Sequence, residues 1–368
     1  MNICVIATAS HRGGALAIYN QFLSHLEKEK REDEYYILVA PNMPQRCIDG
    51  VRYIIVNTSS SLKRIVFDLF NFKRIIHRQG IKIDVLFSLQ NTAVRCNKSI
   101  PQFIYYHQSL PFFNYGYNLL SHAGRSYFFY HYLYPFYVKL LSHGNVGYIV
   151  QTDFIKDCFE RKYKNLAYNT IYSCFPDVED VDDNYVKDFE YEDDTVNFIY
   201  PAIPADYKEH DTLSYALSRI EKISPHVFDK IRIHLTFKAE SYPKFSNLVE
   251  SLHQEKQFVF HGRIGHEQLL SMFKSSKGVL FPSMMETIGL PMLEAAALGI
   301  PVVANDLLFV HSVINNYEGV SFIEPRNYEQ WAQKMLQLCE QSFHYPKLKG
   351  RGSSWPKVFE LIKKSTKK

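Results

Sequence analysis

The feature that most constrains the fold is a series of short apolar runs separated by amphipathic stretches. Each run has four to seven residues rich in Val, Ile, Phe and Tyr, and its apolar character is continuous rather than alternating. Such runs are typical of parallel strands buried on both faces. The runs are Ile3–Ala7, Tyr36–Ala40, Tyr53–Val56, Asp84–Leu89, Phe103–His107, Val146–Val150, Asn197–Pro201, Ile231–Phe237, Phe258–Gly262, Gly278–Pro282, Pro301–Ala304 and Val320–Ile323. Helical patterns lie between them at Ala15–Lys28, His210–Ile223, His266–Phe273 and Tyr328–Cys339. Repeated strand–helix alternation predicts an α/β fold.

Length and composition narrow the class of protein. A chain of 368 residues is expected to form two domains. Lys and Arg (42) nearly balance Asp and Glu (38), which argues against a nucleic-acid partner. The six cysteines form no CxxC pair, which predicts reduced thiols in a cytoplasmic protein. We expect no signal peptide and no membrane-spanning segment, because the sequence has no basic leader and no run of about 18 apolar residues.

An acidic segment at about 174–195 marks the expected boundary between the domains. It contains Asp182, Asp183, Asp193 and Asp194. Paired aspartates can bind a metal, but no histidine or phosphate-binding loop accompanies them, so a solvated linker is the better interpretation. The first domain is therefore expected at 1–175 and the second at 176–345.

The most informative segment is residues 281–305, FPSMMETIGLPMLEAAALGIPVVAN. A buried strand ends at Ser283, a loop follows, and Pro291 stands where a helix begins, a position that proline favours. The helix is expected to stop at Gly299, before the next buried strand. A helix N-terminus at the end of a buried strand offers unpaired N–H donors to phosphate. Glu286 and Glu294 stand on either side of that helix start and can accept hydrogen bonds from the hydroxyls of a nucleotide sugar.

At these residues the sequence resembles glycosyltransferase family 4, whose members have the GT-B fold. The family carries two glutamates separated by seven residues, and Glu286 and Glu294 match that spacing. Pro282, Ser283, Gly289, Pro291, Gly299, Pro301 and Val302 also match the family pattern. The resemblance implies that Glu286, expected as an exposed carboxylate, holds the donor sugar and that Glu294 holds the ribose. It also implies that the backbone N–H groups of Thr287, Ile288, Gly289 and Leu290 face the donor diphosphate.

The resemblance extends to the strand and loop that open the second domain. Lys208 matches a family lysine that faces the diphosphate. A family arginine is absent, because the local sequence is Pro201-Ala202-Ile203, and Arg263 is the expected replacement at a neighbouring strand end.

Two segments of the first half also resemble the family. Gly13 and Gly14 follow the first predicted strand, where glycine lets the backbone approach a phosphate closely. His107 follows another predicted strand and is expected to contact the sugar or the acceptor.

The resemblance implies two Rossmann-like domains with parallel sheets that face a central cleft. Residues 346–368 would form a C-terminal helix that crosses back to the acceptor-side N-terminal domain. The implied reaction is retaining hexosyl transfer from a nucleotide-diphosphate sugar to a glycan or lipid-linked glycan, in the assembly of bacterial polysaccharide such as O-antigen, capsule or lipopolysaccharide. Glu286, Lys208 and His107 would be the catalytic residues, and no metal or other cofactor is expected.

Residues 125–139, RSYFFYHYLYPFYVK, leave two interpretations open. Aromatic side chains flanked by cations suit a membrane interface, which would make a cytoplasmic protein touch the inner face of the membrane. The other interpretation is a tyrosine-rich helix packed on the first sheet, which the poor helical period and Pro135 favour slightly.

Two other functions remain open for the whole chain. The missing arginine would suit a catalytically silent scaffold of this fold that binds a partner enzyme. A nucleotide-sugar epimerase of the same fold would act without an acceptor.

Overall fold

The computed structural model describes all residues except 12, 30–31, 115, 117–118, 165, 167, 169, 178–185, 342, 350–352 and 366–368. The chain divides into two compact units, and each is considered by itself. Unit 1 comprises Met1–Asp177 with Gly352–Lys368, and unit 2 comprises Val178–Arg351. The sequence placed these boundaries at 175/176 and 345/346.

Unit 1 contains a seven-stranded parallel sheet in the order β3-β2-β1-β4-β5-β6-β7. Its strands are β1 (Asn2–Ile6), β2 (Glu34–Val39), β3 (Val51–Ile55), β4 (Val85–Ser88), β5 (Gln102–Tyr106), β6 (Val146–Val150) and β7 (Thr170–Ser173). Its helices are α1 (Gly13–Lys28), α2 (Ser61–Val66), α3 (Phe72–Arg78), α4 (His122–Phe128), α5 (Tyr134–Leu141), α6 (Asp153–Lys162) and α14 (Trp355–Lys364). The π-helical segments η1 (Phe67–Asn71) and η2 (Phe129–Leu133) join α2 to α3 and α4 to α5.

Unit 2 contains a six-stranded parallel sheet in the order β10-β9-β8-β11-β12-β13. Its strands are β8 (Val196–Tyr200), β9 (Ile231–Leu235), β10 (Phe258–Phe260), β11 (Gly278–Phe281), β12 (Val302–Asn305) and β13 (Val320–Ile323). Its helices are α7 (His210–Ile223), α8 (Pro225–Lys230), α9 (Pro243–Ser251), α10 (His266–Lys274), α11 (Leu290–Ala297), α12 (Leu308–Ile314) and α13 (Tyr328–Glu340). Two 3-10 turns, η3 (Asp206–Lys208) and η4 (Ala239–Ser241), follow β8 and β9.

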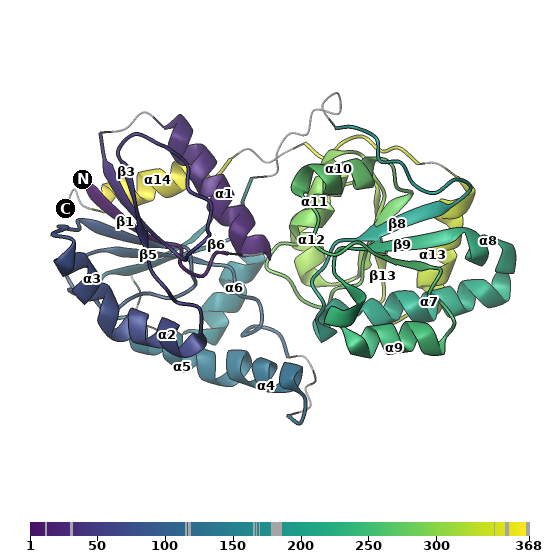
Figure 1. Ribbon diagram of the computed structural model, residues 1–368, viewed down its shortest axis with the longest axis horizontal. Helices are drawn as coiled ribbons and strands as arrows, with labels where there is room; N and C mark the ends of the chain where they lie inside the picture. Colours follow the sequence, from purple (N-terminus) through teal and green to yellow (C-terminus); the bar gives the residue numbers. More distant parts are fainter. Residues whose placement is uncertain are drawn as a thin grey trace. The chain divides into compact units, whose positions relative to one another are not determined.

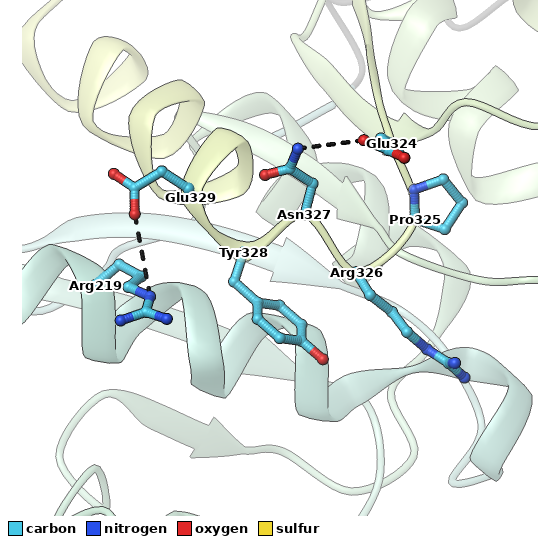
Figure 2. A pocket seen from close by; sticks show the side chains of 7 residues that line it. All are labelled: Arg219, Glu324, Pro325, Arg326, Asn327, Tyr328 and Glu329. Carbon is cyan, nitrogen blue, oxygen red and sulfur yellow. Dashed lines mark hydrogen bonds and ion pairs between the residues drawn. The ribbon is translucent and has the colours of Figure 1, made fainter.

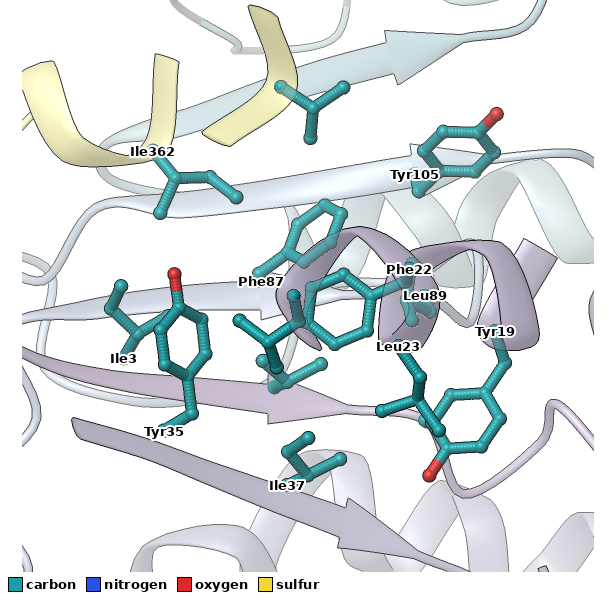
Figure 3. Close-up of a cluster of buried hydrophobic side chains, with 14 of the residues drawn as sticks. Ile3, Tyr19, Phe22, Leu23, Tyr35, Ile37, Phe87, Leu89, Tyr105 and Ile362 are labelled. Carbon is teal, nitrogen blue, oxygen red and sulfur yellow. The ribbon is translucent and has the colours of Figure 1, made fainter. Parts of the chain in front are cut away.

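Helices cover both faces of the first sheet (Figure 1). One face is covered by α1 and α14, and the cluster beneath them includes Phe22, Phe87 and Tyr105 (Figure 3). Trp355 of α14 stacks on Tyr105 with ring centroids 5.6 Å apart and donates a hydrogen bond to Gln21. The C-terminal helix therefore completes the core of unit 1, as the sequence predicted.

The segment before α14 still belongs to unit 2. The backbone N–H of Tyr345 donates to the carbonyl of Gly299, and that of Leu348 donates to the carbonyl of Ala296. Gly299 has φ +75°, and a Cβ there would meet the Tyr345 carbonyl oxygen at 2.5 Å. The close approach of these backbones keeps residues 345–348 with unit 2, which therefore extends beyond the boundary predicted at 345/346.

Several details complete the comparison with the sequence. Every predicted apolar run contains a strand, whereas β7 was not predicted. All six cysteines are free. Among the described residues, no helix is long and apolar enough to cross a bilayer.

Candidate functional site

The central feature of unit 2 is the point where its strand order reverses. The chain leaves β8 toward β9 on one side and returns to β11 on the other. In open parallel sheets, ligands bind outside the carboxyl ends of the strands at such a point. Lys208 follows β8 and Glu286 follows β11, so the topology brings two predicted site residues to this place.

Lys208 and Glu286 form an ion pair, in which the ammonium Nζ donates to Oε1 of the carboxylate. The two side chains are only 10% and 17% exposed, so Glu286 is not the exposed carboxylate that the sequence suggested. Ser283 Oγ also donates to Glu286 Oε1, at 3.2 Å. The ammonium lies 5.3 Å from the ring centroid of Tyr207 and 5.8 Å from that of Phe281. A part-buried cation is thus held against its counter-ion and two aromatic rings.

The turn that carries Lys208 is fixed by its neighbours. Tyr200 Oη donates to the Lys208 carbonyl at 2.8 Å, and the Met284 N–H donates to the Tyr207 carbonyl at 2.8 Å. The second bond ties the loop after β8 to the loop after β11. Because backbone bonds set the positions of both loops, the spacing between Lys208 and Glu286 is built into the unit.

Glu209, the next residue, is held from a third strand end. Its side chain is 9% exposed, and Arg326, beyond β13, donates to both carboxylate oxygens at 2.6 and 3.2 Å. Glu209 and Arg326 both have positive φ, at 51° and 61°. Left-handed backbone is costly for such residues, so packing and this pair must stabilise it. The ion pair between Glu209 and Arg326 was not predicted from the sequence.

The loop between Glu286 and α11 has the expected form. Gly289 has φ +71°, and a Cβ there would meet Met292 Cε at 2.6 Å and the Phe281 ring at 3.2 Å. Thr287 and Ile288 are buried. Within the described part of the chain, the N–H groups of residues 287–290 have no hydrogen-bond acceptor. Free N–H donors at the start of a helix favour an anion.

Glu294 lies one helical turn into α11, and its side chain is 18% exposed. His266 Nε2, at the start of α10, lies 3.0 Å from Glu294 Oε1. The sequence predicted Glu294 but not this partner.

Arg263 is exposed in the loop after β10. The expectation that it stands at a strand end next to β8 is wrong, because β9 separates β10 from β8. Lys238 follows β9 itself and lies over Gly262, where a Cβ would meet Lys238 Cγ at 3.3 Å. Sequence reasoning missed Lys238, which has no motif around it and is marked only by its place after a strand.

In unit 1, His107 follows β5, and Asn91 follows the adjacent strand β4. The His107 N–H donates to Asn91 Oδ1 at 2.5 Å, and His107 Nε2 lies 3.5 Å from Asn91 Nδ2. Burial, together with the Arg64 cation, lowers the pKa of His107 to about 4. The imidazole is therefore neutral near pH 7 and suited to hydrogen bonding rather than to charge stabilisation.

A buried polar network lies beneath the loop that carries Asn91. Asp68 is fully buried and accepts hydrogen bonds from Tyr137, Gln90, Thr92 and Arg64. Desolvation raises the pKa of Asp68, opposed by these partners. These hydrogen bonds hold the loop after β4 in place.

Gly13 and Gly14 open α1 in unit 1, after β1. Gly13 has φ +57°, and a Cβ at either position would meet no heavy atom of the described residues within 4 Å. Glycine at 13 thus meets a backbone requirement, and the space beside both residues is open. Gly13, Gly14 and His107 belong to unit 1 and the other predicted site residues to unit 2.

The acidic segment lies only partly within the described residues. Asp182 and Asp183 lie outside the described residues, and Asp194 pairs with Lys230. Across the residues that the structure describes, no group of three or more His, Cys, Asp or Glu side chains could hold a metal ion.

A polar hollow of about 390 Å³ lies between α7 and the start of α13 (Figure 2). It is lined by Arg219, Glu324, Pro325, Arg326, Asn327, Tyr328 and Glu329. None of the predicted site residues lines it. Arg326 links the hollow to the candidate site, because it donates hydrogen bonds to Glu209, the residue next to Lys208.

Comparisons with known proteins report a family match for part of the chain and a similar fold for the whole. Residues 183–354 match the family described as glycosyl transferases group 1, so a domain of that kind occupies the second half of the chain. A stretch of 94 residues is 26% identical to the O-antigen chain mannosyltransferase RfbU of Salmonella typhimurium. That stretch spans 26% of this chain and 26% of the relative.

Solved structures resemble the whole chain. Sucrose-phosphate synthase from Thermosynechococcus elongatus superposes with a TM-score of 0.66 at 14% identity, covering 99% of this chain and 98% of that one. HepE of Anabaena, solved with UDP and glucose, has a TM-score of 0.59 at 12% identity, covering 93% and 90%. The chain has the GT-B fold that its sequence predicted.

Proposed function

We propose that the protein is a retaining glycosyltransferase that moves a hexosyl group from a nucleotide-diphosphate donor to a hydroxyl of a glycan or lipid-linked acceptor. The observation that carries the proposal is the Lys208–Glu286 ion pair at the β8/β11 switch point, beside the free N–H groups of residues 287–290. A cation and a row of N–H donors are what a departing nucleoside diphosphate requires. The match of residues 183–354 to glycosyl transferases group 1 supports the same class.

The donor would bind with its charges and hydroxyls matched to these groups. Lys208 and the N–H groups of residues 287–290 would hold the diphosphate, with Lys238 or Arg263 as a second cation. Glu286 would accept hydrogen bonds from sugar hydroxyls, and Glu294, oriented by His266, would accept them from the ribose. In the absence of donor, the ion pair neutralises the charges of Lys208 and Glu286. Donor binding would replace part of this contact with contacts from Lys208 to phosphate and from Glu286 to sugar.

Three predicted residues of unit 1 would have binding roles of their own. Gly13 and Gly14 would leave room for phosphate, and the neutral His107 would hydrogen-bond a sugar or acceptor hydroxyl. As the C–O bond to the diphosphate breaks, its negative charge would grow against Lys208 and the loop N–H groups. The acceptor hydroxyl would attack the same face of the anomeric carbon and pass its proton to the departing phosphate. No metal ion is needed in this scheme.

The printed names of two relatives support a pathway and a donor class. RfbU acts in O-antigen assembly by its name, which supports surface polysaccharide biosynthesis, and HepE was solved with UDP, which supports a nucleotide-sugar donor. We place the reaction in the cytoplasm, at the inner face of the membrane.

A donor screen tests the proposal. The full chain is titrated with UDP-, GDP-, ADP- and dTDP-sugars, with and without EDTA, by calorimetry and thermal shift. We expect one class of donor to bind and to raise the thermal midpoint by mass action, with EDTA making no difference. Glu286→Gln should bind that donor more weakly. Absence of binding to every donor would contradict the proposal and favour the silent scaffold.

Product analysis separates transfer from the remaining alternative. The donor that binds is incubated with the protein alone and with glycan acceptors, and the products are resolved by mass spectrometry and proton NMR. We expect free nucleoside diphosphate and a new glycoside with the donor's anomeric configuration. A product whose sugar is epimerised but still attached to the nucleotide would identify an epimerase instead.

A further inference from the structure

The outer side of α5 and η2 in unit 1 exposes a stripe of large apolar side chains. Leu133, Phe136 and Leu140 are 49%, 71% and 62% exposed, and Phe129 and Tyr132 on η2 are also exposed. Positions 129, 133, 136 and 140 recur at helical spacing, so they share one face. We call the five residues the aromatic stripe. Soluble surfaces rarely gather so many large apolar side chains without a partner.

The opposite side of the same helices is packed. Tyr134, Val138 and Leu141 are buried in a cluster with strands of the first sheet. Both interpretations of the 125–139 segment therefore have a basis, since one side of the helix packs on the sheet and the other is bare. The segment is described throughout, and Pro135 stands in the first turn of α5, where it does not interrupt a helix.

The helical segments α2, η1 and α3 contribute further exposed side chains. Tyr137 of α5 donates a hydrogen bond to Asp68 of η1 at 2.7 Å, so the two segments lie side by side. Leu62 of α2 and Phe70 of η1 are 71% and 55% exposed.

Exposed cations lie on the same helices as the apolar side chains and on the helices next to them in the chain. They are Lys63, Lys73, Arg74 and Arg78 on α2 and α3, with Arg125 and Lys139 on α4 and α5. Lys73, Arg74, His77 and Arg78 also line a hollow of about 360 Å³. The sequence contains no Asp or Glu between Asp84 and Asp153, and the only one in 61–83 is Asp68, which is fully buried. The segments that carry the exposed apolar side chains are therefore rich in positive charge and contribute no exposed carboxylate of their own.

This combination selects one kind of partner. Large exposed apolar side chains on a helix, together with exposed Lys and Arg, suit a bilayer interface. There the aromatic and aliphatic side chains enter the headgroup region, and the cations contact lipid phosphates. A protein partner would instead need acidic groups and a surface shaped to receive the stripe.

We propose that the aromatic stripe, with Leu62, Phe70 and the exposed cations of these helices, docks unit 1 on the surface of an anionic lipid bilayer. The proposal identifies the surface that would hold the protein at the membrane. It rests on the proposed function only for the choice of leaflet. Lipid binding is measured without donor or acceptor, so its failure and the failure of the glycosyltransferase proposal are distinguishable.

Vesicle co-sedimentation of the full chain tests the proposal. One set of vesicles is phosphatidylcholine alone, and the other contains phosphatidylglycerol as well. We expect binding to the anionic vesicles at least ~10-fold stronger than to the neutral ones, and weaker binding at high salt. Equal binding to both sets, or binding to neither, would overturn the proposal.

Matched variants locate the contact. Phe136→Ser with Leu140→Ser should weaken binding to anionic vesicles ~10-fold or more, and Lys73→Glu with Arg74→Glu should remove the preference for anionic lipid. Leu308→Ser is the control, because Leu308 is 72% exposed in unit 2. Circular dichroism checks that each variant is folded. If both double variants bind anionic vesicles as strongly as the unaltered protein does, this face is not the docking surface.

A third measurement does not depend on removing contacts. Phe136→Trp should shift its fluorescence to the blue on addition of anionic vesicles, because the indole leaves water. The two natural tryptophans, Trp331 and Trp355, are buried and supply a constant background. No shift with vesicles, or concentration-dependent self-association through this face in the absence of lipid, would overturn the proposal in favour of a protein contact.

Discussion

Arg326 donates two hydrogen bonds to the carboxylate of Glu209, the residue that directly follows Lys208. This pair joins the loop after β13 to the turn after β8, across the strands that lie between them in the sheet. Lys208 is thereby fixed from outside its own loop. We therefore expect Arg326 to act on the proposed site through Glu209, as a positioning residue.

Arg326→Ala should lower kcat/KM for transfer about 10-fold, while donor affinity falls less, because a looser Lys208 loses more in the transition state than in the ground state. Arg326→Lys should recover only part of the activity, since an ammonium cannot reproduce the two-point contact. Steady-state kinetics and calorimetry provide both quantities.

The control for Arg326 is Arg219→Ala. Arg219 lines the same hollow, but its partner is Glu329 at 4.0 Å, on the protein surface (Figure 2). Equal losses from the two substitutions would mean that the hollow, rather than the ion pair between Glu209 and Arg326, affects activity.

Glu286→Gln should reduce transfer at least ~100-fold and also destabilise unit 2 by about 1–3 kcal/mol, because it leaves the part-buried Lys208 without a counter-ion. Urea unfolding measures the second effect. Combining Glu286→Gln with Lys208→Met should restore part of the stability and none of the activity. A double variant no more stable than Glu286→Gln alone would show that the pair is not coupled.

How far the sequence could predict the molecule depends on the range of each interaction. The continuous apolar runs predicted every strand of unit 2, because strands buried on both faces are apolar along their length. β7 was missed because Thr170–Ser173 is short, partly exposed and half hydroxylic. The stripe was missed because aromatic and apolar residues also fill the buried side of the same helices, so no single apolar face stood out from the sequence.

The site divides in the same way. Glu286, Gly289 and Glu294 lie within one strand–loop–helix unit, so their spacing was readable. The contact between Glu286 and Lys208 spans 78 positions and follows from strand order, which periodicity does not report. No sequence motif surrounds Lys238 or Arg326, so only the fold identifies these cations as candidates for the site.

Two glycine substitutions separate a backbone requirement from a binding role. Gly289→Ala should destabilise unit 2 by about 1–3 kcal/mol, since its φ is +71° and the new methyl would press on Met292 and Phe281. Gly14→Ala lies at the start of a helix in open space, so stability should be unchanged or rise by up to ~1 kcal/mol.

Donor binding by the Gly14→Ala variant then tests the proposed role of the loop. Weaker binding by calorimetry, with an undiminished thermal midpoint, is expected if the methyl occupies space that the donor needs. Unchanged binding would remove Gly14 from the site.

His210 predicts a dependence of stability on pH. It is fully buried among Tyr200, Phe237 and Phe245, and burial lowers its pKa from 6.5 to about 3, with Lys208 adding to the effect. Because the native pKa lies below the unfolded one, the unfolded chain binds more protons between pH 6.5 and 3, and stability falls as the pH drops through that window.

His210→Phe should therefore remove on the order of 3 kcal/mol of the loss of stability between pH 7 and pH 4. Urea unfolding at several pH values measures it, with the exposed His226→Phe as control. An unaltered slope for His210→Phe would show that other groups cause the acid sensitivity.

The return of α14 to unit 1 has a consequence for synthesis on the ribosome. Trp355, Val358, Phe359 and Ile362 fill the same cluster as side chains of β1 and α1. Unit 2 is one continuous stretch of the chain, whereas the core of unit 1 cannot be completed before residues 355–362 have been made. The half of the protein that is made first is thus the last to be finished, and until then its apolar interior is within reach of chaperones.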